Sequence, residues 1–281
     1  MREISCQLIH DRIKEALIDM SENLSQDVVD ALQANREKES WPIAQQTLDI
    51  ILENQNIARD THSPMCQDTG MVVCFVDLGQ EVHLVEGQLE EAINRAVADA
   101  YTEAYLRKSV VEEPLFDRKN TEDNSPAVIH VRIVPGEGLK IGLAAKGFGS
   151  ENMSRITMLK PADGLDGVKN FIVETAKNAG PNACPPFVVG VGVGGTFDKA
   201  ATMAKHSLLR PINEKNADPQ LQEIEEECLE RINASGVGPQ GYGGHTTALR
   251  VLMETYPTHI AGLPVAVNIN CHASRHRVFE I

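Results

Sequence analysis

Apolar residues in the first sixty positions recur at the spacing of amphipathic helices. The one-sided spacing i, i+3, i+4, i+7 is filled by Ile13, Ala16, Leu17 and Met20. A similar one-faced set follows Ser40-Trp41-Pro42 and consists of Ala44, Leu48, Ile51 and Leu52. This period matches the turn of an α-helix and not the two-residue repeat of a strand. The pattern therefore predicts a helical lead-in over residues 1–60.

Three further helices are expected downstream. A long apolar stripe over residues 89–104 predicts a helix that ends near Arg107. Shorter patterns predict helices from Gly164 to about Lys177 and from Asp198 to Leu209.

Short runs of β-branched residues predict the strands, at residues 71–78, 187–193, 248–256 and 264–270. Residues 127–134 and 139–145 are separated only by Pro135-Gly136-Glu137-Gly138, which is typical of a β-hairpin. Because hairpin-like strands interrupt the strand–helix alternation, we expect an α+β fold, a mixed sheet with an N-terminal helical layer. We also expect a single domain over residues 1–281, with residues 61–281 as its body.

Charge narrows the range of partners. The chain has 40 acidic and 26 basic side chains and a net charge of -14, the wrong sign for general binding to nucleic acid or anionic lipid. No apolar run reaches the roughly 18 to 20 residues of a membrane span, and the acidic, amphipathic N-terminus is unlike a signal peptide. We therefore expect a cytoplasmic protein whose partners are small molecules or proteins.

One charge run has a simple structural explanation. An acidic helix is expected whose apolar face consists of Leu221, Ile224, Cys228 and Ile232. The glutamates expected to face water are Glu225, Glu226, Glu227 and Glu230. We give this run no function.

Two glycine-rich segments imitate nucleotide-binding motifs. Gly190-x-Gly192-x-x-Gly195 follows a strand and opens a helix, but no second strand ending in an acid follows about twenty residues later. The loop 236–244 is followed by His245, where a P-loop requires a Lys-Ser/Thr pair. A nicotinamide-binding oxidoreductase is therefore the weaker alternative.

The six cysteines are too dispersed for a secreted disulfide framework. Three of them fit the role of small buried hydrophobes: Cys6, Cys74 and Cys228. The other three fall in expected loops: Cys66, Cys184 and Cys271. Their spacing neither demonstrates nor excludes a zinc site, because no C-x-x-C pair is present.

Six long segments carry a more specific signal than any single cysteine. They are SPMCQDTG, DRKNTEDNSPAVIH, AAKGFGSENMSRITMLKPADG, NACPPFVVGVGVGGTFDKA, GPQGYGGHTTALRV and LPVAVNINCHASRH. Together they resemble the alpha subunit of class I, iron-sulfur fumarate hydratases, almost end to end. The alpha subunits of L(+)-tartrate dehydratases are close relatives in the same hydro-lyase family. The resemblance implies the fold of this family's alpha subunit.

The resemblance also implies a cofactor and a set of site residues. Its residue-by-residue match makes Cys66, Cys184 and Cys271 the ligands of a [4Fe-4S] cluster. Three thiolates leave one of four irons without a protein ligand, and that iron can act as a Lewis acid. By the same resemblance Asp68 is the acid–base candidate. The residues implied to line the substrate pocket are Gln67, Arg107, Gly149 and His259.

The implied reaction is the reversible hydration of fumarate to L-malate, with tartrate dehydration as the alternative. The segments AKGFGSENMS and CHASRH favour fumarate. Members of the family also have a second part, which here implies a beta subunit partner carrying further residues for a small dicarboxylate substrate. A homodimer of such pairs is the expected assembly. A non-enzymatic iron-sulfur or zinc-binding interaction protein is the third class.

Overall fold

The computed structural model describes residues 1–281, and the chain forms two compact units. Unit 1 comprises residues 1–25, 55–148 and 275–281, and unit 2 comprises residues 26–54 and 149–274. Each unit contains one four-stranded mixed sheet with helices packed on it. The expected α+β class with mixed sheets is confirmed, while the single-domain organisation stays a prediction.

The sheet of unit 1 has the strand order β10–β5–β2–β4. Its strands are β2 (Met71–Gly79), β4 (Val128–Val134), β5 (Leu139–Lys146) and β10 (His276–Glu280). β2 pairs parallel with β4 and antiparallel with β5, and β10 pairs antiparallel with β5. The predicted hairpin of β4 and β5 is therefore wrong, because β2 lies between these strands. The turn sequence marks where the chain reverses but does not determine which strand becomes the neighbour.

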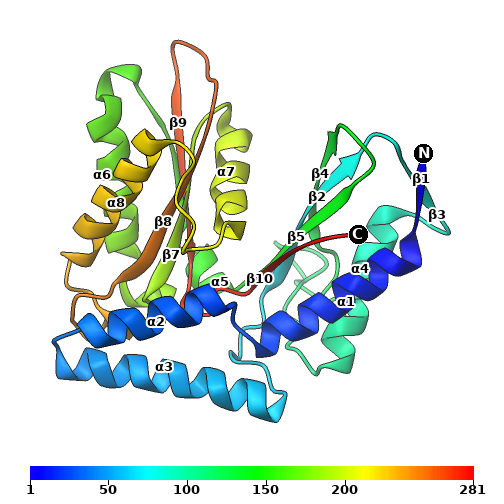
Figure 1. The fold of residues 1–281 in the computed structure, drawn as a ribbon, viewed down its shortest axis with the longest axis horizontal. Coiled ribbons are helices and arrows are strands. Elements are labelled where there is room, and N and C mark those ends of the chain that lie inside the picture. The colour runs from blue at the N-terminus through cyan, green and yellow to red at the C-terminus, as the bar shows by residue number, and fades with distance from the viewer. The chain divides into compact units, whose positions relative to one another are not determined.

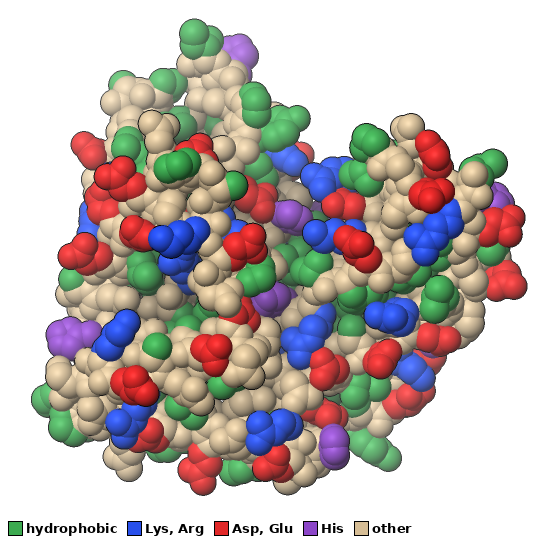
Figure 2. Space-filling view, viewed as in Figure 1, with side chains coloured by type: hydrophobic (Ala, Val, Ile, Leu, Met, Phe, Trp, Pro, Cys, Tyr) green, Lys and Arg blue, Asp and Glu red, His purple; other side chains and the backbone are tan.

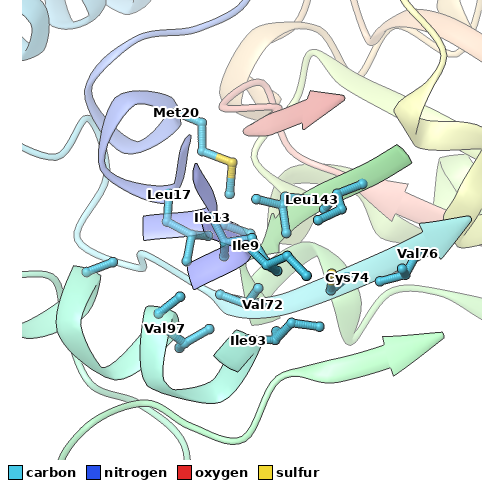
Figure 3. Packing of buried hydrophobic residues seen from close by; sticks show 14 of the residues in the cluster. Ile9, Ile13, Leu17, Met20, Val72, Cys74, Val76, Ile93, Val97 and Leu143 are labelled. Atoms are coloured by element: carbon cyan, nitrogen blue, oxygen red, sulfur yellow. The ribbon is translucent and has the colours of Figure 1, made fainter. Parts of the chain in front are cut away.

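Two helices, α1 (Cys6–Glu22) and α4 (Leu89–Glu103), pack on this sheet. Figure 3 shows the shared core, in which Ile9 and Ile13 of α1 and Ile93 of α4 meet Val72 and Leu143 of the sheet. Burying each such side chain contributes about 1.5–3 kcal/mol. A short parallel pair, β1 (Arg2–Ser5) and β3 (Val82–Val85), completes unit 1 and was not predicted.

The sheet of unit 2 has the strand order β6–β9–β7–β8. Its strands are β6 (Arg155–Leu159), β7 (Phe187–Gly194), β8 (Ala248–Tyr256) and β9 (Leu263–Asn270). β7 is parallel to β8 and antiparallel to β9, and β9 is antiparallel to β6. Both sheets therefore have the same order of strand directions, although the sequence shows no repeat.

Helices cover both faces of the unit 2 sheet (Figure 1): α6 (Gly164–Ala179) and α8 (Pro219–Asn233) on one, α7 (Phe197–His206) on the other. A Cβ at Gly190 would lie 2.1 Å from the carbonyl oxygen of Ala204, and one at Gly192 would lie 2.2 Å from that of Ala200. These glycines stand within β7 and let α7 approach the strand closely. They do not form the phosphate-binding turn of a dinucleotide fold.

The remaining helical elements are two helices near the N-terminus, one short helix and four 3₁₀ turns. They are α2 (Gln26–Lys38), α3 (Pro42–Thr61), α5 (Phe148–Glu151) and the 3₁₀ turns η1 (Pro161–Asp163), η2 (Gly180–Ala183), η3 (Ser207–Leu209) and η4 (Pro239–Gly241). The predicted lead-in is helical apart from β1. Of its helices, α1 belongs to unit 1 and α2 to unit 2.

Glu225 of α8 is buried, contrary to the prediction that it faces water. Its carboxylate accepts hydrogen bonds from Arg210 at 2.6 Å and from the backbone N–H of Met253 at 2.7 Å, and Arg250 lies 3.8 Å away. Glu225 precedes Cys228 by three positions and so shares its buried helix face. Two arginines allow a carboxylate to stay there. The glutamates exposed as predicted are Glu226 and Glu230.

Acidic and basic side chains are interspersed over the visible surface of the molecule, with no large basic patch on this face (Figure 2). None of the helices combines the length and the apolar character that a membrane crossing requires.

Candidate active site

The segment 66–70 forms a loop that leads into β2, and its backbone is tied to the rest of unit 1. The hydroxyl of Tyr101, on α4, lies 2.8 Å from the carbonyl oxygen of Thr69 and 2.9 Å from that of Gly70. The side-chain amide of Asn124 donates to the carbonyl of Gly70 at 3.1 Å. Burial raises the pKa of Tyr101, so its hydroxyl remains a neutral donor. The loop therefore has a defined conformation that sets the positions of its side chains.

Arg107 lies beside this loop. The hydroxyl of Thr69 donates to the carbonyl of Arg107 at 2.9 Å, while the Arg107 side chain is exposed. Because α4 ends at Glu103, Arg107 does not sit at a helix terminus, which corrects the predicted helix end. The structure thus brings Arg107 together with the loop that carries Gln67 and Asp68.

The carboxylate of Asp68 is held by two backbone N–H groups. Oδ1 accepts from Gly70 at 3.0 Å, and Oδ2 accepts from Phe148 at 2.8 Å. Phe148 follows β5, whose end lies beside the start of β2 because Lys146 pairs with Met71. A carboxylate has further lone pairs beyond the two used here, so Asp68 can accept a hydrogen bond from another partner.

Next to Asp68 lies a buried guanidinium without a hydrogen-bond partner. A Cβ at Gly147 would lie 3.3 Å from Asp68 Oδ2 and 3.5 Å from an amino nitrogen of Arg275. Arg275 is 1% exposed, and none of its three side-chain nitrogens has a partner. An unpaired buried charge is costly, and here it stands beside the carboxylate proposed for acid–base work.

In unit 2, two of the candidate thiols lie at the same end of the sheet. Cys184 precedes β7 and Cys271 follows β9; since Val188 pairs with Asn270, the start of β7 and the end of β9 are adjacent. The backbone N–H of His272 donates to the carbonyl of Cys184 at 3.3 Å. The topology therefore joins two residues that are 87 positions apart. No group of three or more His, Cys, Asp or Glu side chains is gathered in metal-binding geometry.

Cys184 is exposed and has a left-handed backbone, with φ 51° and ψ 64°. Non-glycine residues in this region cost roughly 1–3 kcal/mol and are concentrated at functional sites. Gly149 lies close to the same segment, since a Cβ there would stand 3.3 Å from the carbonyl oxygen of Asn182. Gly149 thus joins the predicted ligand Cys184 in unit 2.

The three cysteines assigned to the core are buried, as predicted. Burial raises the pKa of Cys74 to about 12 and that of Cys228 to about 11. Burial likewise raises the pKa of Cys6. Metal ligands must be thiolates, so these environments oppose a ligand role.

His259 is not brought to the thiols of unit 2. It lies in the exposed loop that joins β8 to β9, whereas Cys271 follows the other end of β9. The eight residues of β9 separate the two by roughly 26 Å at about 3.3 Å per residue. Within one chain His259 and Cys271 therefore lie at opposite ends of β9, and the predicted role of His259 in substrate binding stays a prediction.

Several residues around the site carried no recognisable signal in the sequence. Arg275 stands in a segment that resembles the family, but nothing distinguishes a buried arginine from an exposed one by type. Tyr101 looked like one apolar position of a helical stripe. Gln240 and His272, whose side chains lie 3.1 Å apart, come from loops that are far apart in the sequence, so only the folded structure shows that they are neighbours.

Comparison with known proteins assigns the chain to a family. The family model for fumarate hydratase (Fumerase) matches residues 10–280. The chain belongs to this family.

Curated relatives cover nearly the whole chain. A protein of Methanocaldococcus jannaschii named "Putative L(+)-tartrate dehydratase subunit alpha" is 41% identical over 278 residues, covering 97% of each chain. An Escherichia coli protein named "L(+)-tartrate dehydratase subunit alpha" is 32% identical over 266 residues, covering 93% of this chain and 87% of its own. A protein of the same name from Shigella sonnei is 32% identical over 260 residues, covering 91% and 85%. The resemblance stated from the sequence is confirmed.

Proposed function

We propose that this chain is the cluster-bearing alpha subunit of a hydro-lyase that reversibly hydrates fumarate to L-malate. The observation that carries the proposal is the family match over residues 10–280. The relatives named as subunits alpha of a dehydratase support the same reaction class, because hydration and dehydration are one reaction in two directions.

The proposed ligands of a [4Fe-4S] cluster are Cys66, Cys184 and Cys271. The donor set fits, since these three thiols lie in loops whereas Cys6, Cys74 and Cys228 lie in helices or strands, and the pairing of β7 with β9 puts Cys184 and Cys271 at the same end of one sheet. When bound, such a cluster offers an iron without a protein ligand that polarises substrate oxygens. Free thiols of this kind stay reduced in the cytoplasm, which is the location we propose.

The chain's own residues supply the remaining chemistry. Asp68 exchanges the proton at the substrate carbon next to the one that carries the hydroxyl, which is general acid–base work. Its two backbone hydrogen bonds fix the direction of the free lone pairs. Arg107 binds a substrate carboxylate through its exposed guanidinium, and Gln67 and the backbone of Gly149 provide hydrogen bonds.

The proposal includes a protein partner. Relatives carry the word "subunit" in their names, and we propose that a beta subunit supplies further groups for the dicarboxylate, so that this chain alone has little or no activity. A homodimer of alpha–beta pairs is the proposed assembly.

A second candidate is L(+)-tartrate dehydration, which the names of the relatives favour. Both reactions act on a four-carbon dicarboxylate and move a hydroxyl and a proton on neighbouring carbons, so the same residues serve either. L-Malate and L(+)-tartrate differ by one hydroxyl. Residues around Gly149 and residues of the partner would distinguish the two substrates by binding or excluding this group.

An anaerobic assay of the alpha–beta pair on fumarate, L-malate, L-tartrate and mesaconate tests the proposal. We expect fumarate and malate to turn over with the highest kcat/KM. Dominant tartrate dehydration would replace the first candidate by the second. Full activity of the isolated 281-residue chain would remove the beta subunit from the proposal.

A further inference from the structure

The glycine-rich loop of residues 236–244 has no role in the function proposed above, yet it lies against both thiol-bearing segments of unit 2. From the contacts made by this loop we infer that Gln240 is a positioning residue that holds Cys184 and Cys271 in place for a metal cluster through His272. The inference rests on the proposed function for the identity of the cluster. The contacts among Gln240, Pro185 and His272 lie within the chain and involve no metal.

Gln240 directs two donors at a single carbonyl. Its backbone N–H and its side-chain Nε2 both donate to the carbonyl oxygen of Pro185, each at 2.8 Å. Gln240 has a left-handed backbone with φ 52°, an unfavourable conformation for a residue with a side chain. Because Pro185 directly follows Cys184, the pair of bonds fixes the backbone on the C-terminal side of this thiol.

The same amide group reaches the segment that contains the other thiol. Gln240 Nε2 lies 3.1 Å from His272 Nδ1. An amide nitrogen has two hydrogens and no acceptor site; with one hydrogen on Pro185, the second is available to Nδ1. The contact to Pro185 thus orients the amide so that it can donate to Nδ1 in the His272 tautomer in which Nδ1 accepts.

His272 closes the connection. Its backbone N–H donates to the carbonyl of Cys184 at 3.3 Å in either tautomer. Its Nδ1 lies 3.0 Å from the same oxygen and donates to it only in the tautomer that does not accept from Gln240. As His272 directly follows Cys271, the two thiol segments are joined to one another and to one glutamine. We call the three residues Gln240, His272 and Pro185 the amide clamp.

The loop that presents Gln240 is itself held firmly. Buried Glu39 accepts hydrogen bonds from the backbone N–H groups of His245 at 2.8 Å and Thr246 at 3.0 Å. A Cβ at Gly241 would lie 2.6 Å from the side chain of Pro181, so glycine is required for the loop to pack beside the turn that ends at Cys184. The clamp is therefore preformed by contacts within the chain.

A preformed clamp makes a clear prediction for protein without cluster. Two thiols on backbone segments that are held side by side should be bridged by a trivalent arsenical, which forms one As–S bond to each thiolate and releases water or hydroxide from arsenic. Phenylarsine oxide added anaerobically to the full, metal-free chain should bind across Cys184 and Cys271. Its binding should be lost in Cys184→Ser and in Cys271→Ser and kept in Cys74→Ser.

The decisive variants remove the clamp and leave the thiols. Gln240→Ala removes both side-chain contacts of the clamp and should weaken arsenical binding roughly tenfold, which is within the range that hydrogen bonds contribute. It should slow the anaerobic regain of the cluster's visible absorbance by a similar factor. Gln220→Ala on the exposed surface of α8 is the matched control and should behave as the wild type. Equal behaviour of Gln240→Ala and Gln220→Ala would overturn the inference.

A second pair of variants tests the role of Nδ1 and leaves Gln240 unchanged. In His272→Asn the amide oxygen stands near the place of Nδ1 and can accept from Gln240, whereas in His272→Gln it stands near Nε2. We expect His272→Asn to retain more arsenical binding than His272→Gln; the reverse order would overturn the clamp. Failure of the wild-type chain to take up iron and sulfide would contradict the proposed function instead, and the arsenical measurements would still decide on the clamp.

Discussion

Asp68 accepts a hydrogen bond at 2.8 Å from the backbone N–H of Phe148, a residue 80 positions later in the chain. This bond ties the carboxylate to the end of β5, while Gly70 binds its second oxygen. The proposed acid–base group is thus oriented by backbone atoms, which no side-chain substitution elsewhere removes directly.

Asp68→Asn should keep the fold and the iron content but lower turnover of the alpha–beta pair by roughly 10²- to 10⁴-fold, the usual range for lost acid–base help. The amide oxygen can still accept one backbone bond, but an amide is too weak a base and too weak an acid for general acid–base catalysis near neutral pH. Iron content and kcat measured on the same sample separate the two effects. Asp60→Asn on the surface is the control, and near-normal turnover of Asp68→Asn would leave Asp68 as a turn residue.

Replacement of each cysteine by serine should divide the six into two groups. Cys66→Ser, Cys184→Ser and Cys271→Ser should lose iron and activity together, because a neutral hydroxyl is a poor ligand for iron. Cys74→Ser and Cys228→Ser should retain iron. Iron analysis and visible absorbance after anaerobic reconstitution measure both. A cluster that needs Cys74 and not Cys184 would contradict the assignment.

Glu39→Gln should destabilise the protein by about 1–3 kcal/mol at pH 7, since a buried acceptor of several N–H donors is lost. Burial alone would raise the pKa of Glu39, but hydrogen bonds from Trp41, His245 and Thr246 outweigh it, and the pKa lies below its ordinary value of 4.5. A lowered folded pKa adds stability above the unfolded pKa and loses it as pH falls through the folded pKa. The difference in unfolding free energy should therefore be constant above pH 4.5 and shrink below it. A difference independent of pH down to acid unfolding would contradict this cause.

Glu225→Gln should be much more damaging than Glu230→Gln. Removing the buried carboxylate leaves Arg210 and Arg250 without their anionic partner, which costs about 3–5 kcal/mol. Glu230 is exposed on the same helix and its substitution should change stability by less than about 0.5 kcal/mol. Chemical denaturation of both variants provides the comparison, and equal stabilities would mean that the buried pair adds nothing.

Gly190→Ala should destabilise unit 2, because the new methyl group would meet the carbonyl of Ala204. Overpacking of this kind costs about 1–3 kcal/mol. Gly138→Ala, at a position with no atom within 4 Å of the new Cβ, is the control. Nicotinamide cofactors should bind neither variant nor the wild type in a fluorescence titration. Stoichiometric binding to the wild type would restore the alternative that the sequence left open.

Local patterns predicted the elements well, because helix and strand periods are local properties. The strand over residues 71–78 and the long helix from Leu89 lie within a few residues of the observed β2 and α4. The prediction of strand neighbours was wrong, because β2, from a distant part of the chain, lies between β4 and β5. No local pattern encodes such a pairing.

The candidate site was likewise predicted only in part, since motifs locate residues but not their neighbours in space. The motifs located Cys184 and Cys271, but their adjacency depends on the antiparallel pairing of β7 with β9. Residue type alone placed Glu225 in water, although two arginines far away in sequence hold it inside. His259, matched by resemblance, lies at the far end of β9 from Cys271, and its role in substrate binding stays a prediction.

The edge strand β10 makes the sheet of unit 1 depend on a segment far away in the chain. β10 pairs with β5 and is part of unit 1, yet it follows every strand of unit 2 in the sequence. The backbone groups of β5 on this side therefore stay unpaired until residues 276–280 have docked. An exposed strand edge invites pairing with other chains, so a chain in which β10 is detached has an added tendency to aggregate.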